Sequence, residues 1–341
     1  MKVGVYQHGI NWSWEKVKEY WLTVDKLGFD AGWMMDNGVY PDMDGNMLDV
    51  WETWTVLSIL AEITDNIRMG PMVTPCRRRN PGLLAKMTAC IDQISKGRLD
   101  LAIGSGDDPI YFVPWGQTYP KASERVKYLS EEIEILKRMW TEKAVNFEGE
   151  YYTLAEATAD PKPHQNPHIP VWVGLVMGRK VMPKLAAEQA DAINVYNASD
   201  RASAELLALV EEHCAEIGRD YHAIPKSRSV NVIMTDGTFN PSSLPTQADG
   251  SFPHVIGSPE ELAQERAATL DMQHQRVKAS DDKHSIYSRV TERHVIGTPD
   301  EIVDELKEIA GNTYEQVIIH GLNTMEDVQR FASDILPKLK D

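Results

Sequence analysis

The chain has few cysteines and no long apolar run. Its three cysteines (Cys76, Cys90 and Cys214) lack the spacing of a metal site or a disulfide framework. No window approaches the roughly 18 consecutive apolar residues of a membrane span. The opening residues, "MKVGVYQHGI", also lack the long apolar region of a signal peptide. These absences predict a reduced, cytoplasmic protein.

Basic residues are scarce. The 341 residues include 35 Lys and Arg against 51 Asp and Glu, which gives a formal net charge of −16. Nucleic acids and anionic membranes both favour clustered basic residues, so the charge balance argues against either as a partner. We therefore expect a small-molecule substrate.

Motifs for metal or nucleophilic catalysis are also missing. The sequence contains no HExxH, no GxSxG and no closely spaced cysteine pair. The stretch "DMDGN" at 42–46 suggests calcium, but Met47 stands where the EF-hand loop requires glycine. The chemistry is therefore expected to come from a bound organic cofactor.

Short apolar runs alternate with helical patterns along most of the chain. Strands are predicted near 2–7, 31–35, 67–75, 98–104, 171–174, 192–196, 227–235 and 314–321, and helices follow them. Eight such units predict an α/β fold, a (β/α)8 TIM barrel made from one domain, 1–341. The stretch 144–157 predicts a hairpin excursion. An insertion at about 236–298, with a polar helix near 259–278, separates strand seven from its helix.

Polar residues directly after the strands are candidates for the site, because a TIM barrel builds its site there. Gly104 and Gly106 form either a tight turn or a place where a flat ligand approaches the backbone. The run Arg77 to Arg79 is either solvated charge or an anion site before a helix N-terminus. His8 and His320 are either acid/base groups or structural histidines.

Several motifs occur in one order and at consistent distances. They are "KLGFDAGWMMDN", "IRMGPMVTPCRRRNPGLLAKMTACIDQISKGRLDLAIGSGDD", "PWGQTYPKASERVKYLSEEIEILKRMW", "VNFEGEYYTL", "PKPHQNPHIPVWVG" and "LAAEQADAINV". In these motifs the chain resembles the bacterial luciferase-like family of FMN- and coenzyme F420-dependent oxidoreductases. The likeness runs from residue 1 to about 220 and resumes at "VIGTPDEIVDELKEIA".

The resemblance implies a deazaflavin or flavin lying across the C-terminal mouth of the barrel. It implies a non-proline cis peptide at Pro71-Met72 or a neighbouring bond. It places Asp107, His8 and Asn37 on the catalytic side. The implied cofactor contacts are Asp36, Asn37, Met72, Thr74, Gly104, Ser105, Gly106, Gly174, Leu175, Met177, Gly178, Arg179 and Lys180.

Two residues depart from the family pattern. Asn37 stands where many F420-dependent members carry histidine, and asparagine cannot act as a general acid at neutral pH. Asp107 stands where the sugar-phosphate dehydrogenase subgroup carries glutamate. The phosphate turn also differs, since Arg179 and Pro183 lie inside it.

The predicted activity is hydride transfer between coenzyme F420, or a flavin, and a small organic substrate. The alternatives are an FMN-dependent monooxygenase served by a flavin reductase, and a cofactor-binding protein without catalysis. A glycoside hydrolase using Asp36 and Asp107 is a further alternative. The Trp- and Met-rich helices after the second and third strands form either a homodimer interface or part of the core.

Overall fold

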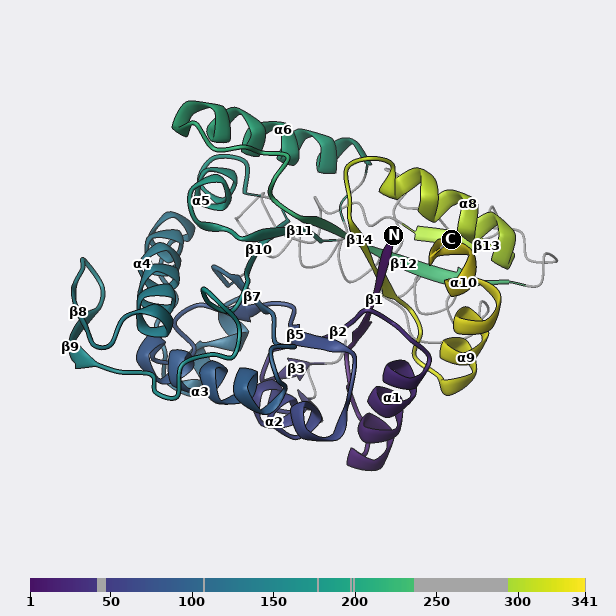
Figure 1. Cartoon of the computed structure of the whole chain (residues 1–341), viewed down its shortest axis with the longest axis horizontal. Helices are drawn as coiled ribbons and strands as arrows, with labels where there is room; N and C mark the ends of the chain where they lie inside the picture. Colours follow the sequence, from purple (N-terminus) through teal and green to yellow (C-terminus); the bar gives the residue numbers. More distant parts are fainter. Residues whose placement is uncertain are drawn as a thin grey trace.

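Parallel strands form the centre of the molecule, and helices surround them (Figure 1). The computed structural model describes residues 1–41, 47–106, 108–176, 178–196, 198, 200–235 and 294–340. In these residues one ten-stranded sheet runs in the order β5-β2-β1-β14-β12-β11-β10-β7-β6, and β13 pairs with β12. Its strands are β1 (Lys2–Gln7), β2 (Ala31–Met34), β5 (Arg68–Pro71), β6 (Thr74–Pro75), β7 (Leu101–Gly104), β10 (Val171–Leu175), β11 (Ala192–Val195), β12 (Lys226–Met234), β13 (His294–Gly297) and β14 (Gln316–His320).

The sheet closes where β5, at one end of the strand order, contacts the residues that precede β7, near the other end. Met69 and Leu99 form a parallel bridge. The Met69 N–H donates to the Arg98 carbonyl over 2.9 Å, and the Asp100 N–H donates to the Met69 carbonyl over 2.8 Å. The Arg68 guanidinium also pairs with the Asp100 carboxylate at 2.7 Å. These contacts bring the sheet round on itself, so the predicted barrel is confirmed.

Helices cover the outside of the barrel. They are α1 (Trp14–Lys26), α2 (Thr53–Ile63), α3 (Pro81–Ile94), α4 (Ala122–Thr141), α5 (Met182–Gln189), α6 (Asp200–Ile217), α8 (Pro299–Ala310), α9 (Met325–Asp334) and α10 (Leu336–Lys340). Local sequence sets several ends. The Asn80 side chain accepts hydrogen bonds from the Gly82 and Leu83 N–H groups, and Pro81 is the first residue of α3. At α8, the Thr298 N–H and hydroxyl both donate to the Glu301 carboxylate at 2.8 Å.

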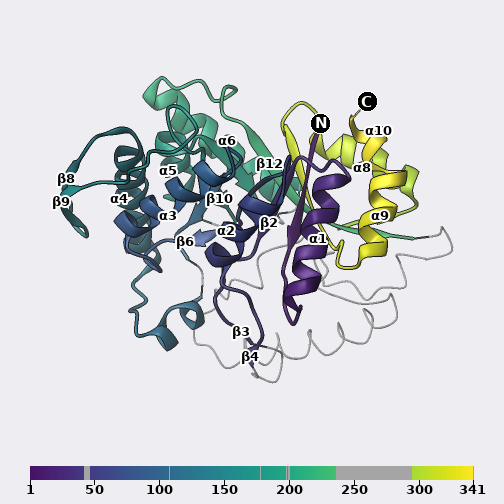
Figure 2. The ribbon, with the colours of Figure 1, turned by 60° about the horizontal axis from the view of Figure 1, so that its bottom comes forward.

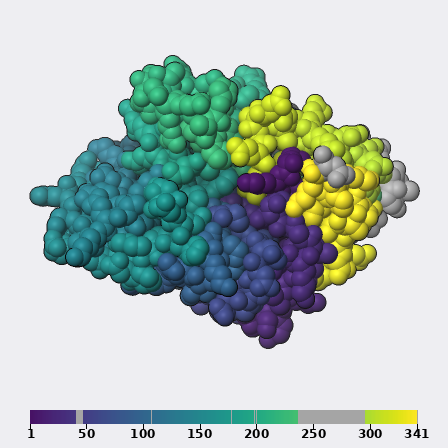
Figure 3. Space-filling model, viewed as in Figure 1, coloured from purple at the N-terminus to yellow at the C-terminus, as the bar shows by residue number. Residues whose placement is uncertain are grey.

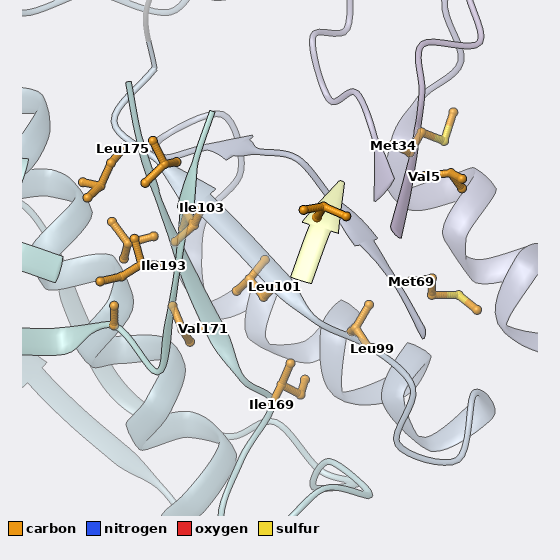
Figure 4. Packing of buried hydrophobic residues seen from close by; sticks show 14 of the residues in the cluster. Val5, Met34, Met69, Leu99, Leu101, Ile103, Ile169, Val171, Leu175 and Ile193 are labelled. Carbon is orange, nitrogen blue, oxygen red and sulfur yellow. The ribbon is translucent and has the colours of Figure 1, made fainter. Parts of the chain in front are cut away.

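The main core lies between the strands and the helices. In Figure 4, Val5, Leu101, Ile103, Val171 and Ile193 belong to one buried cluster that spans several neighbouring strands. All five are at most 1% exposed. These strands are buried on both faces, which explains why they read as nearly continuous apolar runs rather than as alternating patterns.

Two hairpins leave the barrel. The predicted excursion is confirmed as β8 (Val145–Glu148) and β9 (Thr153–Ala157), which project beyond α4 in Figures 1 and 2. A shorter antiparallel pair, β3 (Tyr40–Pro41) and β4 (Met47–Leu48), follows β2. In Figure 2 this pair lies on the opposite side of the molecule from the labelled N- and C-termini.

The predicted insertion at 236–298 is only partly covered by the structure. Residues 236–293, including the helix predicted at 259–278, lie outside the described residues. The last part differs from the prediction, because His294–Gly297 forms β13 and pairs in parallel with Asn231 to Met234 of β12. The insertion therefore ends before this strand, which extends the barrel sheet.

The first and last described segments lie side by side. The purple and yellow residues meet on the face shown in Figure 3, and the Met1 ammonium donates to the Leu339 carbonyl over 3.3 Å.

No helix in the described part of the chain is both long and apolar enough to cross a bilayer.

Candidate functional site

The polar residues predicted for the site gather at one end of the barrel, because parallel strands place their carboxyl ends together. His8 follows β1, Asp36 and Asn37 follow β2, and Thr74 lies in β6. Gly104 ends β7, and Gly174 is the fourth residue of β10. This is the side from which the β3–β4 hairpin projects (Figure 2).

The Asp36 carboxylate is buried and accepts hydrogen bonds from side chains of the protein. It is 2% exposed. Arg79 donates to both carboxylate oxygens, at 2.7 and 3.1 Å, and the Thr74 hydroxyl donates at 2.9 Å. The Trp54 indole donates in turn to the Thr74 hydroxyl over 3.1 Å. This pairing removes Asp36 as the free carboxylate that a glycoside hydrolase would require.

Arg78 joins two loops at the mouth of the barrel. Its guanidinium donates to the Asp36 backbone carbonyl, and to the Tyr111 carbonyl over 3.2 Å. The side chain is 9% exposed and lies over the Phe112 ring. Arg78 and Arg79 are therefore neither solvated charges nor a ready anion site, since both bind groups of the protein.

A non-proline cis peptide lies between Met72 and Val73, one bond beyond Pro71-Met72 and within the predicted neighbourhood. The Val73 side chain reaches over two neighbouring strands. A Cβ added at Gly104 would lie 2.9 Å from Val73, and one added at Gly174 would lie 3.1 Å from it. The two glycines thus make room for Val73, which forms part of the floor of the mouth.

The turn after β7 is fixed by a helix. The Arg125 side chain of α4 donates to the carbonyl oxygens of Ser105 and Gly106, at 3.2 and 3.1 Å. Gly106 has a φ of +76°, and a Cβ there would lie 2.7 Å from the Phe112 ring. The role of Arg125 is not predictable from the sequence, because this residue lies about 20 residues beyond the turn that it holds.

Aromatic rings surround the two histidines. The Tyr6 ring stacks on His320 at 4.2 Å and meets His8 edge-on at 4.8 Å. Tyr196 approaches His320 at 5.3 Å, and the two histidine rings are 6.2 Å apart. His320 is fully buried, whereas His8 is half-buried. His8 is therefore the histidine with access to the mouth.

The turn before α5 is exposed. Gly178, Arg179 and Lys180 are all exposed, and Arg179 pairs with Glu205 at 2.7 Å. Among the described residues no side chain caps the start of α5. A helix N-terminus beside basic residues suits an anion. Leu175, by contrast, is fully buried.

Two predicted site residues, Asp107 and Met177, lie outside the described residues. Within the described ranges, no group of three or more His, Cys, Asp or Glu side chains could hold a metal ion.

Glu132 is a buried carboxyl that the sequence analysis missed. It is 0% exposed, and one oxygen accepts from the Arg77 N–H at 3.0 Å and from the Tyr152 hydroxyl at 3.2 Å. Burial raises its pKa to about 7, although these hydrogen bonds and the nearby Arg79 oppose the shift. Apolar residues recur three and four positions apart along α4, and this spacing could have indicated that position 132 lies on the buried face of the helix.

A surface depression of about 550 Å³ lies beside the start of α1. Its lining includes Trp12, Trp14, Asp49 and Trp51. The Trp51 indole donates to the Trp12 carbonyl over 2.9 Å, which joins the β1–α1 loop to the residues before α2. The lining contains none of the residues predicted for the site, so the depression is separate from it.

Known proteins resemble this chain over all or most of its length. An F420-dependent glucose-6-phosphate dehydrogenase from Amycolatopsis mediterranei is 25% identical, and the alignment covers 100% of this chain and 99% of that protein. An FMNH2-dependent dimethylsulfone monooxygenase from Pseudomonas putida is 24% identical over 94% of this chain and 84% of its own length.

The fold is also found among solved structures. An F420-dependent secondary alcohol dehydrogenase in complex with an F420-acetone adduct superposes with a TM-score of 0.76 at 18% identity. The match covers 100% of this chain and 99% of the other. The sequence pattern of the luciferase-like monooxygenase family matches residues 2–316. The chain therefore belongs to the luciferase-like monooxygenase family of oxidoreductases.

Proposed function

We propose that the protein transfers a hydride between coenzyme F420 and a small organic substrate. The observation that carries the proposal is the floor of the mouth, where the Val73 side chain, next to the cis Met72-Val73 bond, lies against Gly104 and Gly174. The two glycines let the Val73 side chain pack closely against the strand ends, and we propose that a flat ring system lies on the floor formed in this way. The cofactor, when bound, supplies the hydride chemistry, and the chain's own residues bind, orient and move protons.

The residues beside this floor take different roles. Asn37 and His8 line the substrate side, where Asn37 orients the substrate by hydrogen bonds and His8 exchanges a proton. Asp107 is the second proton-transfer group. Asp36 and Thr74 act by holding the loop that carries Asn37, because their polar atoms are bound to Arg79 and Trp54.

The cofactor's phosphate end is assigned to the turn before α5. Gly178, Arg179 and Lys180 are exposed there, at an uncapped helix N-terminus. Gly174, Leu175 and Met177 lead the chain into this turn, and Ser105 and Gly106 border the ring. Basic groups at this edge favour F420 over FMN, because F420 carries both a phosphate and an acidic tail.

A titration tests the cofactor assignment. Purified protein is mixed with F420 or with FMN, and binding is followed by absorbance. Tight binding of F420 with weak binding of FMN is the expected result. Asp107→Asn should abolish most turnover while F420 binding stays within about twofold of wild type, since only proton transfer is lost. Lys184→Gln, an exposed change on α5 beyond the turn, serves as the control. Binding of neither cofactor would refute the proposal.

An FMN-dependent monooxygenase is the second candidate. It is favoured by the likeness to the dimethylsulfone monooxygenase, which covers 94% of this chain. That activity would need reduced FMN, oxygen and a flavin reductase as partner. Oxygen uptake with reduced FMN would support it, whereas oxidation state changes of F420 without oxygen uptake support the dehydrogenase or reductase.

We further propose a cytoplasmic homodimer that buries part of α2 and α3. The exposed apolar side chains there are Ile59, Leu83 and Ile94, at 42%, 56% and 43% exposure. Trp54 belongs to the core instead, at 0% exposure. Light scattering should give a dimer mass, and Leu83→Glu should shift it to the monomer. A monomer in the wild-type protein would refute this part.

A further inference from the structure

The inside of the barrel is unusually polar. Asn194 of β11 lies in register with Ser227 of β12, and Ser227 lies in register with Gln316 of β14. Asn194 and Ser227 are fully buried, and Gln316 is 5% exposed. TIM barrels usually fill this space with layers of branched apolar side chains. A row of amides and hydroxyls on three neighbouring strands therefore needs a reason.

Several polar atoms in this interior have no partner among the described residues. They are the indole nitrogens of Trp33 and Trp172, the Asn194 side-chain oxygen and the Gln316 side-chain oxygen. The set contains two donors and two acceptors. The other end of the Asn194 amide is occupied, since it donates to the hydroxyls of Ser227 and Ser229 at 3.0 and 3.3 Å.

Two pairs of these groups lie close together, one at the two indoles and one beside Gly4. The Trp33 and Trp172 rings meet edge-on with centroids 5.5 Å apart. A Cβ added at Gly4 would lie 3.2 Å from the Trp33 indole nitrogen and 3.3 Å from the Gln316 amide nitrogen. Because glycine has no side chain, position 4 of β1 covers neither the Trp33 indole nor the Gln316 amide.

We propose that the barrel interior binds a cluster of ordered water molecules, held by Trp33, Trp172, Asn194 and Gln316. Buried polar groups are satisfied by protein or by ordered water, and a buried water makes about three hydrogen bonds. The indoles donate to water, the amide oxygens accept from it, and the hydroxyls of Ser227 and Ser229 can do either.

The cluster lies directly beneath the mouth. The Ser229 hydroxyl is 3.9 Å from the Met72 sulfur, and Met72 is the first residue of the cis bond. The floor of the mouth therefore rests on a polar, exchangeable layer rather than on a dry core. This inference stands on the barrel interior alone and does not depend on the proposed cofactor.

Indole N–H resonances test the proposal in the full-length protein. Deuterated protein with 15N-labelled tryptophan should show direct cross-peaks to water at the Trp33 and Trp172 indoles. Trp21 is the matched control, because it is 1% exposed and its indole donates to the Gln7 side-chain oxygen over 2.7 Å. Its indole should show no water cross-peak. Trp→Phe variants assign the signals.

A second measurement covers the case in which those variants do not fold. A high-resolution crystal structure of the wild-type protein should show water density about 3 Å from the Trp33 indole nitrogen and from the Asn194 oxygen. Gly4→Ala should displace the water nearest Trp33. A Trp33 indole that behaves like Trp21, or a rotated Gln316 amide bonded directly to Trp33, would overturn the proposal.

Discussion

Glu132 makes the stability of this protein depend on pH. Its carboxyl group is completely buried, and only one oxygen is hydrogen-bonded, to the Arg77 N–H and the Tyr152 hydroxyl. Burial raises the pKa from 4.5 to about 7. Between these two pH values the native state holds a proton that the unfolded state has released. The contribution of this proton to the free energy of unfolding is therefore fully present below pH 4.5, and it is lost as the pH rises towards 7.

The size of the effect follows from the pKa. Each pH unit over which the native state binds one extra proton changes the free energy of unfolding by about 1.4 kcal/mol. Between pH 5.5 and pH 8, the Glu132 carboxyl should therefore cost the native state about 2 kcal/mol. Most of that loss should occur below pH 7.

Glu132→Gln removes the titration and keeps the shape. The amide oxygen can still accept from Arg77 and Tyr152, and the amide nitrogen replaces the unbonded oxygen. Urea unfolding at fixed protein concentration, at pH 5.5 and pH 8, should show the variant gaining about 2 kcal/mol relative to wild type as the pH rises. The carbon-13 signal of the Glu132 carboxyl should titrate near pH 7 in the wild-type protein.

The neighbouring Glu134→Gln is the matched control. Glu134 lies on the same helix but is exposed, and it pairs with Arg138 at 3.7 Å. Its difference from wild type should be nearly the same at both pH values. A flat difference for Glu132→Gln as well would refute the reasoning from burial.

Three further predictions concern single positions. Asp36→Asn should destabilise the native state by about 3 kcal/mol in urea unfolding, because the largely buried Arg79 loses one of its two carboxylate partners and keeps only the half-exposed Glu52; an effect under 1 kcal/mol would contradict this. Asn80→Ala should cost about 1 kcal/mol by removing the cap of α3, whereas Asn80→Ser should restore most of it. Gly106→Ala should weaken cofactor binding in a titration by about tenfold or more, because its positive φ costs about 1 to 3 kcal/mol and its Cβ meets Phe112; unchanged affinity would contradict the role of this turn.

The barrel could be predicted from the sequence because its signals are local. Strands buried on both faces are short apolar runs, and helix ends such as Asn80-Pro81 carry their own caps. β13 is not predicted from the sequence, because "HVIG" is only four residues long and directly precedes a helix cap. Short apolar runs leave such assignments ambiguous.

The candidate site was predicted in position but not in contacts. Strand ends identified Asp36, Thr74 and Gly104 because barrel geometry places such residues together. Their partners come from distant parts of the chain: Arg79 lies 43 residues beyond Asp36, and Arg125 lies 19 residues beyond Gly106. No periodic pattern connects residues at such separations. For the run Arg77 to Arg79 the sequence therefore leaves open solvated charge or an anion site, and neither describes Arg78 and Arg79, which bind groups of the protein.

The position of β14 has a consequence for synthesis of the chain. β14 lies between β1 and β12 in the sheet, and Lys2 to Val5 pair with Gln316 to Ile319. Ribosomes add about 5 to 20 residues per second, so β1 waits roughly 15 to 60 seconds for this neighbour. Throughout that interval the nascent chain carries an open strand edge, which is a template for pairing with other chains. A change in the rate of translation should therefore alter the soluble yield of this protein. The change should be larger than for a protein of the same length in which each strand pairs with one close to it in the sequence.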